Sequence, residues 1–140
     1  MIRVFVDANT VVSGLLFEGN ESHLLDMAFL SLIEVVTIDY VMREVRGALG
    51  RKEFGLSESE VSRLILVALG WIRLLADPLE EELRKSWNVL NDEKNHPVLV
   101  RFQESGYDVL VTGDKELLEK VPRSMRTKNF LRFLRKKLSG

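Results

Sequence analysis

Short apolar segments alternate with helical patterns along the chain, and this alternation constrains the fold more than any other feature of the sequence. The segments that read as strands are residues 4–6, 33–37, 71–75 and 108–112. The helical patterns cover residues 22–32, 39–49, 57–69, 95–106 and 128–138. Strands that alternate with helices pair in parallel and carry helices on both faces of the sheet. The sequence therefore predicts one α/β domain over residues 1–140, a three-layer α/β/α sandwich with a short, mainly parallel central sheet.

Three of the predicted helices begin with recognisable local signals. Asp39 is predicted as the N-cap of the second helix, because a short carboxylate can accept from unpaired backbone amides there. Ser57 and Glu60 have the spacing of a capping box. Asn95 is predicted as an N-cap because Pro97 belongs in a first helical turn.

Length and composition fit one folded domain. With 140 residues and a hydrophobic fraction of 46%, the chain can bury a real core. It contains no cysteine, which excludes disulfides and thiolate metal sites. No stretch approaches the roughly 18 uncharged apolar residues of a membrane span, and Arg3 and Asp7 argue against a signal peptide. We therefore expect a cytoplasmic protein without membrane contact.

Charge is unevenly distributed along the chain. The net charge is −1, but residues 120–140 carry eight lysines and arginines and no acidic residue. Residues 1–119 carry 12 basic and 21 acidic residues. We expect the last helix to pack its apolar face on the body. Its basic face then either holds a nucleic-acid backbone, or only offsets the acidic body or packs on a partner.

Two of the predicted strands end at a carboxylate. Asp7 follows the first strand in "VFVDANT", and Asp114 follows the fourth in "VLVTGDKELL". The carboxyl ends of parallel strands meet at one edge of a sheet, where ligands bind. Two charges about 4 Å apart repel by roughly 4 kcal/mol at an effective dielectric near 20, so these groups bind a cation, protonate or lie farther apart. Oxygen ligands without cysteine favour Mg²⁺ or Mn²⁺ over zinc.

Glu44 has two interpretations from its helix alone. It lies about 60° around the helix from Val41, at the border of the buried stripe, so its carboxylate could reach the edge of the sheet. Alternatively, it is an ordinary boundary glutamate that pairs with Arg51.

The motifs at the two ends of the chain resemble the PIN-domain ribonucleases. "VFVDANTVVSGLL" is similar to the opening signature of that family, and "YDVLVTGDKELL" to its closing signature in the archaeal and bacterial branch that includes VapC toxins. The resemblance spans residues 2–118. It implies a PIN-like fold and a nuclease that acts on single-stranded or structured RNA with Mg²⁺ or Mn²⁺ held by acidic residues.

The family's site residues transfer to this sequence one by one. The resemblance implies metal-ligating, catalytic carboxylates at Asp7, Glu44 and Asp114. The supporting polar positions of the family fall on Asn9, Ser13 and Thr112. We expect Asn9, Ser13 and the neighbouring Thr10 to hydrogen-bond Asp7 or its waters, or to cap the helix that follows.

One position departs from the family pattern. Relatives usually carry an aspartate about nineteen residues before the last one, and here that position is Asn95 in "NDEKNHPVL". Asp92 lies three residues earlier and matches the first of two acids found in this branch. We therefore predict that Asp92 supplies the catalytic, metal-binding carboxylate and that Asn95 assists it. His96 is expected to be solvated.

The resemblance and metal chemistry together predict hydrolysis of RNA phosphodiester bonds by metal-activated water. Basic residues that flank Glu44 are predicted to bind the substrate: Arg43, Arg46, Arg51 and Lys52. Trp71 and Trp87 are predicted to lie in the core or at an interface.

Several alternatives remain open on the sequence. The nuclease could be the toxin of a toxin–antitoxin pair, with an antitoxin protein as partner, and relatives suggest a homodimer. A PIN-fold module that binds RNA or protein and has lost catalysis is a second interpretation, with Asn95 as its sign. A phosphate-accepting receiver-like domain also clusters acids at a sheet edge, but Lys115 follows its acid directly and fits such a domain poorly.

Overall fold

Within the described residues, 1–86 and 88–140, the computed structural model has five parallel strands in one sheet. They are β1 (Ile2–Val6), β2 (Ile33–Ile38), β3 (Ile72–Leu75), β4 (Val109–Val111) and β5 (Ser124–Met125). Their order across the sheet is β3-β2-β1-β4-β5. The prediction for Trp87 lies outside the described residues.

The first strand lies at the centre of the sheet. Val4 of β1 is in register with Val35 of β2 on one side and with Val109 of β4 on the other. Val4, Phe5 and Val6 are fully buried, as expected for a central parallel strand covered on both faces. The residue after Val6 is therefore attached to the most rigid part of the sheet.

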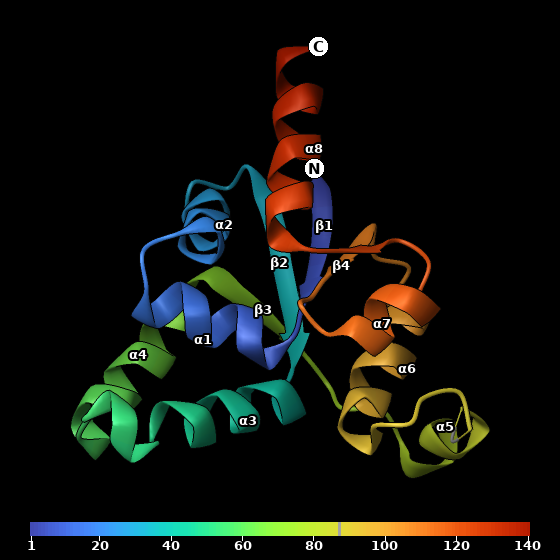
Figure 1. Ribbon diagram of the computed structural model, residues 1–140, viewed down its shortest axis with the longest axis horizontal. Helices are drawn as coiled ribbons and strands as arrows, with labels where there is room; N and C mark the ends of the chain where they lie inside the picture. Colours follow the sequence, from blue (N-terminus) through green and yellow to red (C-terminus); the bar gives the residue numbers. More distant parts are fainter. Residues whose placement is uncertain (87) are drawn as a thin grey trace.

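Helices cover both faces of the sheet, so the predicted α/β/α sandwich is confirmed (Figure 1). They are α1 (Ala8–Leu16), α2 (Asn20–Phe29), α3 (Asp39–Leu49), α4 (Glu58–Trp71), α5 (Glu80–Lys85), α6 (His96–Ser105), α7 (Lys115–Lys120) and α8 (Thr127–Ser139), with 3₁₀ turns η1 (Lys52–Phe54) and η2 (Glu93–Asn95). In Figure 1, α1, α2 and α4 lie to the left of the sheet and α6 and α7 to the right. Among the described residues, none of the helices combines the length and apolar character needed to span a bilayer.

Two of the three predicted helix starts are correct, and one needs correction. Ser57 and Glu60 form the predicted capping box at α4. Asp39 is not the N-cap of α3, because Ile38 occupies that position and Asp39 is the first helical residue. Its carboxylate still lies in the first turn, where negative charge is favourable. Asn95 occupies the N-cap position of α6, but its side chain makes no capping bond.

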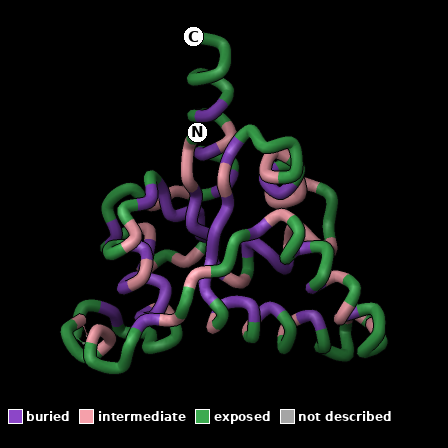
Figure 2. Tube along the Cα trace, turned by 180° about the vertical axis from the view of Figure 1, so that it is seen from behind, coloured by how far each residue is buried: buried purple, intermediate pink, exposed green. Residues whose placement is uncertain are grey.

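Burial is concentrated in the strands and on the inner faces of the helices (Figure 2). The C-terminal helix α8 takes part with Phe130 and Leu134, which are buried, whereas Phe133 is 40% exposed. Residues 135–140 are all exposed, and Figure 1 shows this end of α8 extending beyond the sheet. The predicted packing of α8 on the body is therefore confined to its first half.

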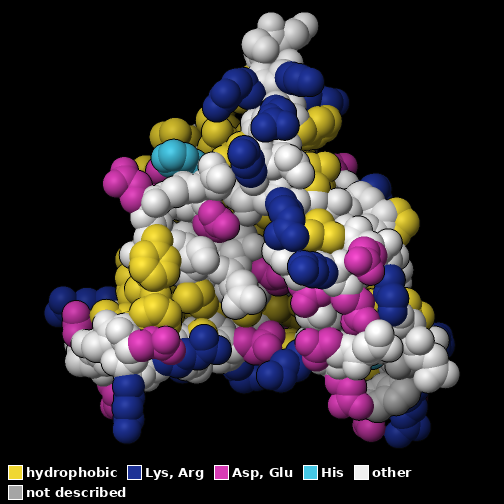
Figure 3. Space-filling model, viewed as in Figure 1, with side chains coloured by type: hydrophobic (Ala, Val, Ile, Leu, Met, Phe, Trp, Pro, Cys, Tyr) yellow, Lys and Arg dark blue, Asp and Glu magenta, His cyan; other side chains and the backbone are white. Residues whose placement is uncertain are grey.

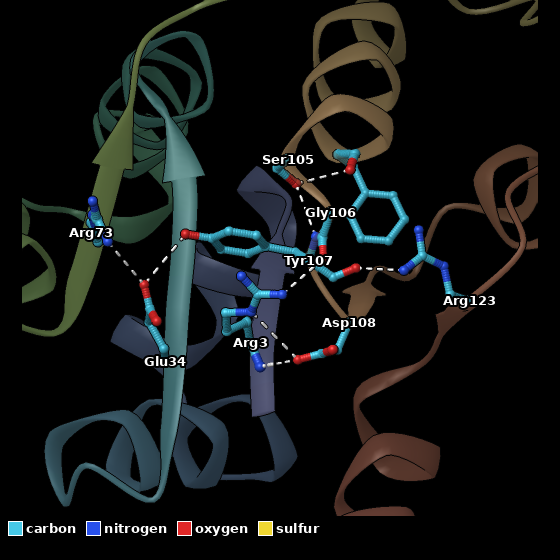
Figure 4. A network of polar contacts seen from close by, with 9 residues as sticks. Arg3, Glu34, Arg73, Ser105, Gly106, Tyr107, Asp108 and Arg123 are labelled. Atoms are coloured by element: carbon cyan, nitrogen blue, oxygen red, sulfur yellow. Dashed lines mark hydrogen bonds and ion pairs between the residues drawn. The ribbon is translucent and has the colours of Figure 1, made fainter. Parts of the chain in front are cut away.

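A network of polar contacts joins the beginnings of the strands (Figure 4). Its charged and aromatic members are Arg3, Glu34, Arg73, Tyr107, Asp108 and Arg123. The backbone amide of Arg3 donates to Asp108 at 2.7 Å, and its guanidinium lies over the ring of Tyr107. The Tyr107 hydroxyl in turn donates to Glu34 at 3.3 Å. The acidic residues Glu34 and Asp108 at this edge of the sheet are thus engaged by basic and aromatic side chains of the protein itself.

Candidate functional site

Asp7 is held at the end of β1 by two hydrogen bonds from Thr10. Its side chain is 9% exposed, and its Oδ1 accepts from the backbone amide of Thr10 at 3.0 Å and from the Thr10 hydroxyl at 2.8 Å. Asp7 is therefore the N-cap of α1. A strand that ends on a carboxylate thus gives that carboxylate a rigid backbone and a fixed orientation.

Thr112 connects the two aspartates at the ends of neighbouring strands. Its hydroxyl donates to Oδ2 of Asp7 and accepts from the backbone amide of Asp114 at 3.0 Å. Asp114 is the N-cap of α7, since its Oδ1 accepts from the amide of Leu117 at 3.0 Å. The expected supporting role of Thr112 thus has a direct geometric counterpart.

Glu44 lies on α3 beside the buried residues Val41 and Val45 and is itself half-buried. Burial raises the pKa of Glu44 above the usual glutamate range. The Lys94 ammonium opposes this rise in pKa, whereas the carboxylates of Asp7 and Asp92 add to it. Among the ion pairs of residues 1–86 and 88–140, none joins Glu44 to Arg51, so the alternative interpretation of an ordinary pair is not supported.

The loop that carries Asp92 is fastened to α7. Glu116 accepts from the backbone amides of Asn91 at 2.9 Å and Asp92 at 3.1 Å, and these bonds hold the pKa of Glu116 below its usual range. Lys120 donates to the carbonyl of Val89 at 3.1 Å and to Glu116 at 3.3 Å. Sequence reasoning missed Glu116, because an acid in a first helical turn indicates only a helix start.

The four predicted carboxylates line one cavity of about 220 Å³. Its lining comprises Asp7, Glu44, Asp92 and Asp114 together with Ala8, Asn9, Arg51, Lys94, Asn95 and Val98. A larger cavity of about 610 Å³ lies at the opposite edge, between the start of β1 and α8, and Asp108 is its acidic residue. The structure therefore brings the sequence-predicted acids together, and away from this larger cavity.

The donor set of this cavity matches a hard divalent cation in chemistry. Its acidic ligands are all oxygen donors, which suits Mg²⁺ or Mn²⁺. Asn95 also lines the cavity, and its buried side-chain nitrogen Nδ2, a hydrogen-bond donor and not a metal ligand, has no hydrogen-bond partner. As placed in the described part of the chain, no three His, Cys, Asp or Glu side chains are positioned to hold one ion together. Joint coordination therefore requires at least one carboxylate to turn.

Of the remaining predicted residues, some line the carboxylate cavity and others lie outside it. Asn9 and Asn95 line it, whereas Ser13 lines a neighbouring cavity between α1 and α8. His96 was expected to be solvated, but it is 2% exposed, and its Nε2 lies 3.1 Å from the carbonyl of Ser86. This correction follows from the position of His96 at the start of α6, where the preceding chain covers it.

The four predicted substrate-binding cations lie at different places around the site. Arg51 lines the carboxylate cavity, and Lys52 is exposed on η1. Arg43 pairs with Asp77 at 2.9 Å, and Arg46 lies at another cavity, 3.5 Å from the Ser62 hydroxyl. Lys94 lines the carboxylate cavity and was missed, because a lysine in a polar loop carries no local signal.

Comparisons with known proteins add evidence at the level of the fold. No family model matches the chain, and neither does any curated protein. The chain is similar to the crystal structure of PAE2754 from Pyrobaculum aerophilum, with a TM-score of 0.74 and 19% identity over 96% of each chain. It is also similar to VapC20 of Mycobacterium tuberculosis, a toxin that cleaves the sarcin–ricin loop, with a TM-score of 0.58 and 13% identity over 83% of this chain and 93% of that one.

The fold is PIN-like. The resemblance of the two end motifs therefore has a structural counterpart over nearly the whole chain. In this PIN-like fold, "VFVDANT" supplies β1 and the start of α1, and "VLVTGDKELL" supplies β4 and α7. The two motifs meet where Thr112 contacts Asp7.

Proposed function

We propose that this chain is a metal-dependent endoribonuclease that hydrolyses RNA phosphodiester bonds at the carboxylate cavity. The observation that carries the proposal is that Asp7, Glu44, Asp92 and Asp114 come from four separate parts of the chain and line one cavity. Their mutual repulsion is costly at short range, which favours a bound cation. The PIN-like nuclease fold supports the same conclusion.

The metal and the protein have separate roles in this proposal. A bound Mg²⁺ or Mn²⁺ would supply Lewis acidity and a lowered pKa for water. Asp7 and Asp114 would hold the ion with the Thr112 hydroxyl fixing their orientation, and Glu44 and Asp92 would supply further carboxylate oxygens.

Other residues of the cavity would act on the substrate. Arg51 and Lys94 are cations that would attract the phosphate to an otherwise acidic cavity. The unpartnered Nδ2 of Asn95 is a hydrogen-bond donor for a phosphate or water oxygen.

The test is cleavage of a labelled RNA of mixed structure with Mg²⁺, Mn²⁺ or EDTA. We expect metal-dependent cleavage that falls in Asp7→Asn by more than the roughly 10- to 100-fold typical of residues that only support a ligand. Asp26→Asn, an exposed change on α2, is the matched control and should keep full activity. Cleavage that persists in Asp7→Asn would contradict the proposal.

A second candidate is a PIN-fold module that binds RNA or protein without cleaving it. It is favoured by one observation, the neutral Asn95 where relatives usually carry an aspartate. Binding of RNA without cleavage by the wild type, together with cleavage gained in Asn95→Asp, would support this candidate over the first.

We also propose a biological setting for this chain. The likeness to VapC20, a toxin, supports a toxin role with an antitoxin partner for this chain. A homodimer, a cytoplasmic location and a single domain over residues 1–140 stay predictions. Sedimentation of the purified chain, alone and co-expressed with a candidate antitoxin, tests the partners.

A further inference from the structure

A second polar cavity of about 200 Å³ adjoins the carboxylate cavity. It is lined by Asn9, Thr10, Ser13, Asn20, Glu21, Thr112, Gly113, Arg126, Thr127 and Lys128. Asn9 lines both cavities, and Thr112, whose hydroxyl contacts Asp7, lines the second. A chain-like ligand with one group in the first cavity would therefore place its next group in or near the second.

The side chains of this second cavity suit an oxyanion. Arg126 and Lys128 are both exposed and bring two positive charges against the single carboxylate of Glu21. Arg126 donates one bond, from Nη1 to the carbonyl of Gly113 at 3.3 Å, which holds its side chain over the cavity. A guanidinium has five N–H donors, so Arg126 keeps donors for a phosphate. The Ser13 hydroxyl adds a neutral donor to the lining of this cavity.

The positive charge continues from this cavity along α8. Lys128, Arg132, Arg135 and Lys136 recur at helical spacing on one face of α8, opposite the buried Phe130 and Leu134. In Figure 3, lysine and arginine side chains follow α8 down to the centre of the face, where aspartates and glutamates gather. Among the ion pairs of the described residues, none involves these four cations.

The basic residues of α3 have different surroundings. Arg43 is paired with Asp77, and Arg46 lies at a cavity that is lined by α4 residues such as Glu58 and Ser62. A strand of RNA that leaves the carboxylate cavity therefore meets a continuous row of unpaired cations along α8. On the side of α3, Arg43 is engaged by Asp77, whereas Arg51 and Lys52 join no ion pair of the described residues.

We propose that the cavity of Arg126 and Lys128 binds the RNA phosphate next to the bond that is cleaved, and that the basic face of α8 binds the phosphates that follow. This inference rests on the proposed nuclease function, since it takes the carboxylate cavity as the place of cleavage. It assigns the direction in which the substrate strand leaves the site, and it assigns Arg126, Lys128, Arg132 and Arg135 to substrate binding.

The test separates binding from cleavage. Binding of a fluorescent single-stranded RNA is measured in EDTA by anisotropy over a range of salt concentrations. We expect Arg126→Gln/Lys128→Gln to weaken binding about equally for different sequences and to reduce the slope of log K against log salt by about 0.7 for each lost contact. Lys128→Gln alone keeps the Arg126–Gly113 contact and should give about half of the slope change.

Two matched pairs serve as comparisons. Arg84→Gln/Lys85→Gln removes the same charge from the exposed helix α5 and should leave the slope unchanged. Arg46→Gln/Lys52→Gln tests the alternative path over α3. A slope that changes with the α3 pair, or equally with all three pairs, would overturn the proposal. An unchanged slope in Arg126→Gln/Lys128→Gln would also overturn the proposal. This holds even if an acidic protein proves to bind this face.

Cleavage assays with the same variants separate this inference from the proposed function. RNA that binds through Arg126 and Lys128 but is not cut by the wild type with any metal would refute the nuclease proposal. RNA that is cut in the Asp7-dependent manner, with no effect of the α8 changes on binding, would refute only the path over α8.

Discussion

At the scale of single residues, the Thr112 hydroxyl is the contact on which the geometry of the carboxylate cavity depends most. It donates to Asp7 and accepts from the amide of Asp114, so one oxygen sets the relation between two strand ends. Thr112 is 1% exposed, and water is therefore a poor substitute for either bond.

Thr112→Val tests this contact with almost no change of volume. The substitution leaves a buried carboxylate oxygen of Asp7 and the amide of Asp114 without their partner, which we expect to cost about 1–3 kcal/mol in the free energy of unfolding. Cleavage should fall by roughly 10- to 100-fold. Urea unfolding and initial rates measure the two effects. Thr112→Ser keeps the hydroxyl and should stay close to wild type; equal losses in both variants would mean that the methyl group matters instead.

Glu116 is predicted to act on the site only through the loop of Asp92. Glu116→Ala removes the acceptor for the amides of Asn91 and Asp92, so the loop should move and cleavage should slow by roughly 10-fold or more. Glu119→Ala is the control, since Glu119 is exposed on the same helix. The KM for RNA and the kcat are measured separately. Identical kinetics in the two variants would refute the positioning role.

At the scale of helices, the capping box of α4 gives a prediction about pH. Hydrogen bonds from the Ser57 backbone amide and hydroxyl hold the pKa of Glu60 below its usual range. The folded pKa is thus lower than the unfolded value of about 4.3. The stabilisation by the Glu60 carboxylate is therefore complete at a pH above the unfolded-state pKa. It is lost as the pH falls through the folded-state pKa.

Glu60→Gln keeps an oxygen acceptor but cannot titrate. We therefore expect the difference in the free energy of unfolding between wild type and Glu60→Gln to shrink as the pH falls below about 4. Chemical unfolding at several pH values measures it. Glu58→Gln removes a charge from the same first turn outside the capping box. If both variants follow the same pH profile, the helix dipole rather than the capping box explains the effect.

Two glycines in helices predict opposite effects of the same substitution. An added Cβ at Gly14 in α1 would lie 2.6 Å from Leu25 Cδ1 and 3.0 Å from the Glu21 carbonyl, so Gly14→Ala should destabilise by about 1–3 kcal/mol. Gly47 in α3 is exposed with open space around it, and Gly47→Ala should stabilise by up to about 1 kcal/mol. Thermal melting compares the two. If both substitutions shifted the melting temperature in the same direction, α1 and α2 would not be packed as described.

The elements that sequence reasoning located are those with a long apolar period. The four predicted strands and five predicted helices have counterparts, because buried faces impose their spacing on the residues. Three helices were given no predicted range. α5 and α7 have six residues each, which give too little periodicity, and α1 entered only as the helix that Asn9 and Thr10 would cap. Strand β5 has two half-buried residues, Ser124 and Met125, and its pairing with β4 depends on the rest of the fold.

At the scale of the whole molecule, part of the site follows from topology alone. The carboxylates after β1 and β4 were predictable because adjacent parallel strands end at the same edge. The engagement of Arg43 by Asp77 and of the Asp92 loop by Glu116 was not predictable. These contacts join segments 24 or more positions apart, through side chains whose partners only the folded chain brings near.

Metal binding should appear as a change in global stability. Ions that bind only the folded cavity raise the free energy of unfolding, by about 2.7 kcal/mol at 100 times Kd. We therefore expect Mn²⁺ or Mg²⁺ to raise the melting temperature of the wild type by several degrees over EDTA. Asp114→Asn should lose most of this shift, and NaCl of equal ionic strength should not produce it. A wild type that melts identically with and without the ions would contradict the metal proposal.

The central position of β1 also bears on when the protein becomes active during its own synthesis. Asp7 is synthesised before its partner Thr112, which follows 105 positions later together with the neighbouring strand β4. A nascent chain therefore carries one wall of the cavity without the other until β4 has been made. If this protein cuts RNA, the ribosome that makes it holds an incomplete site until translation passes Asp114.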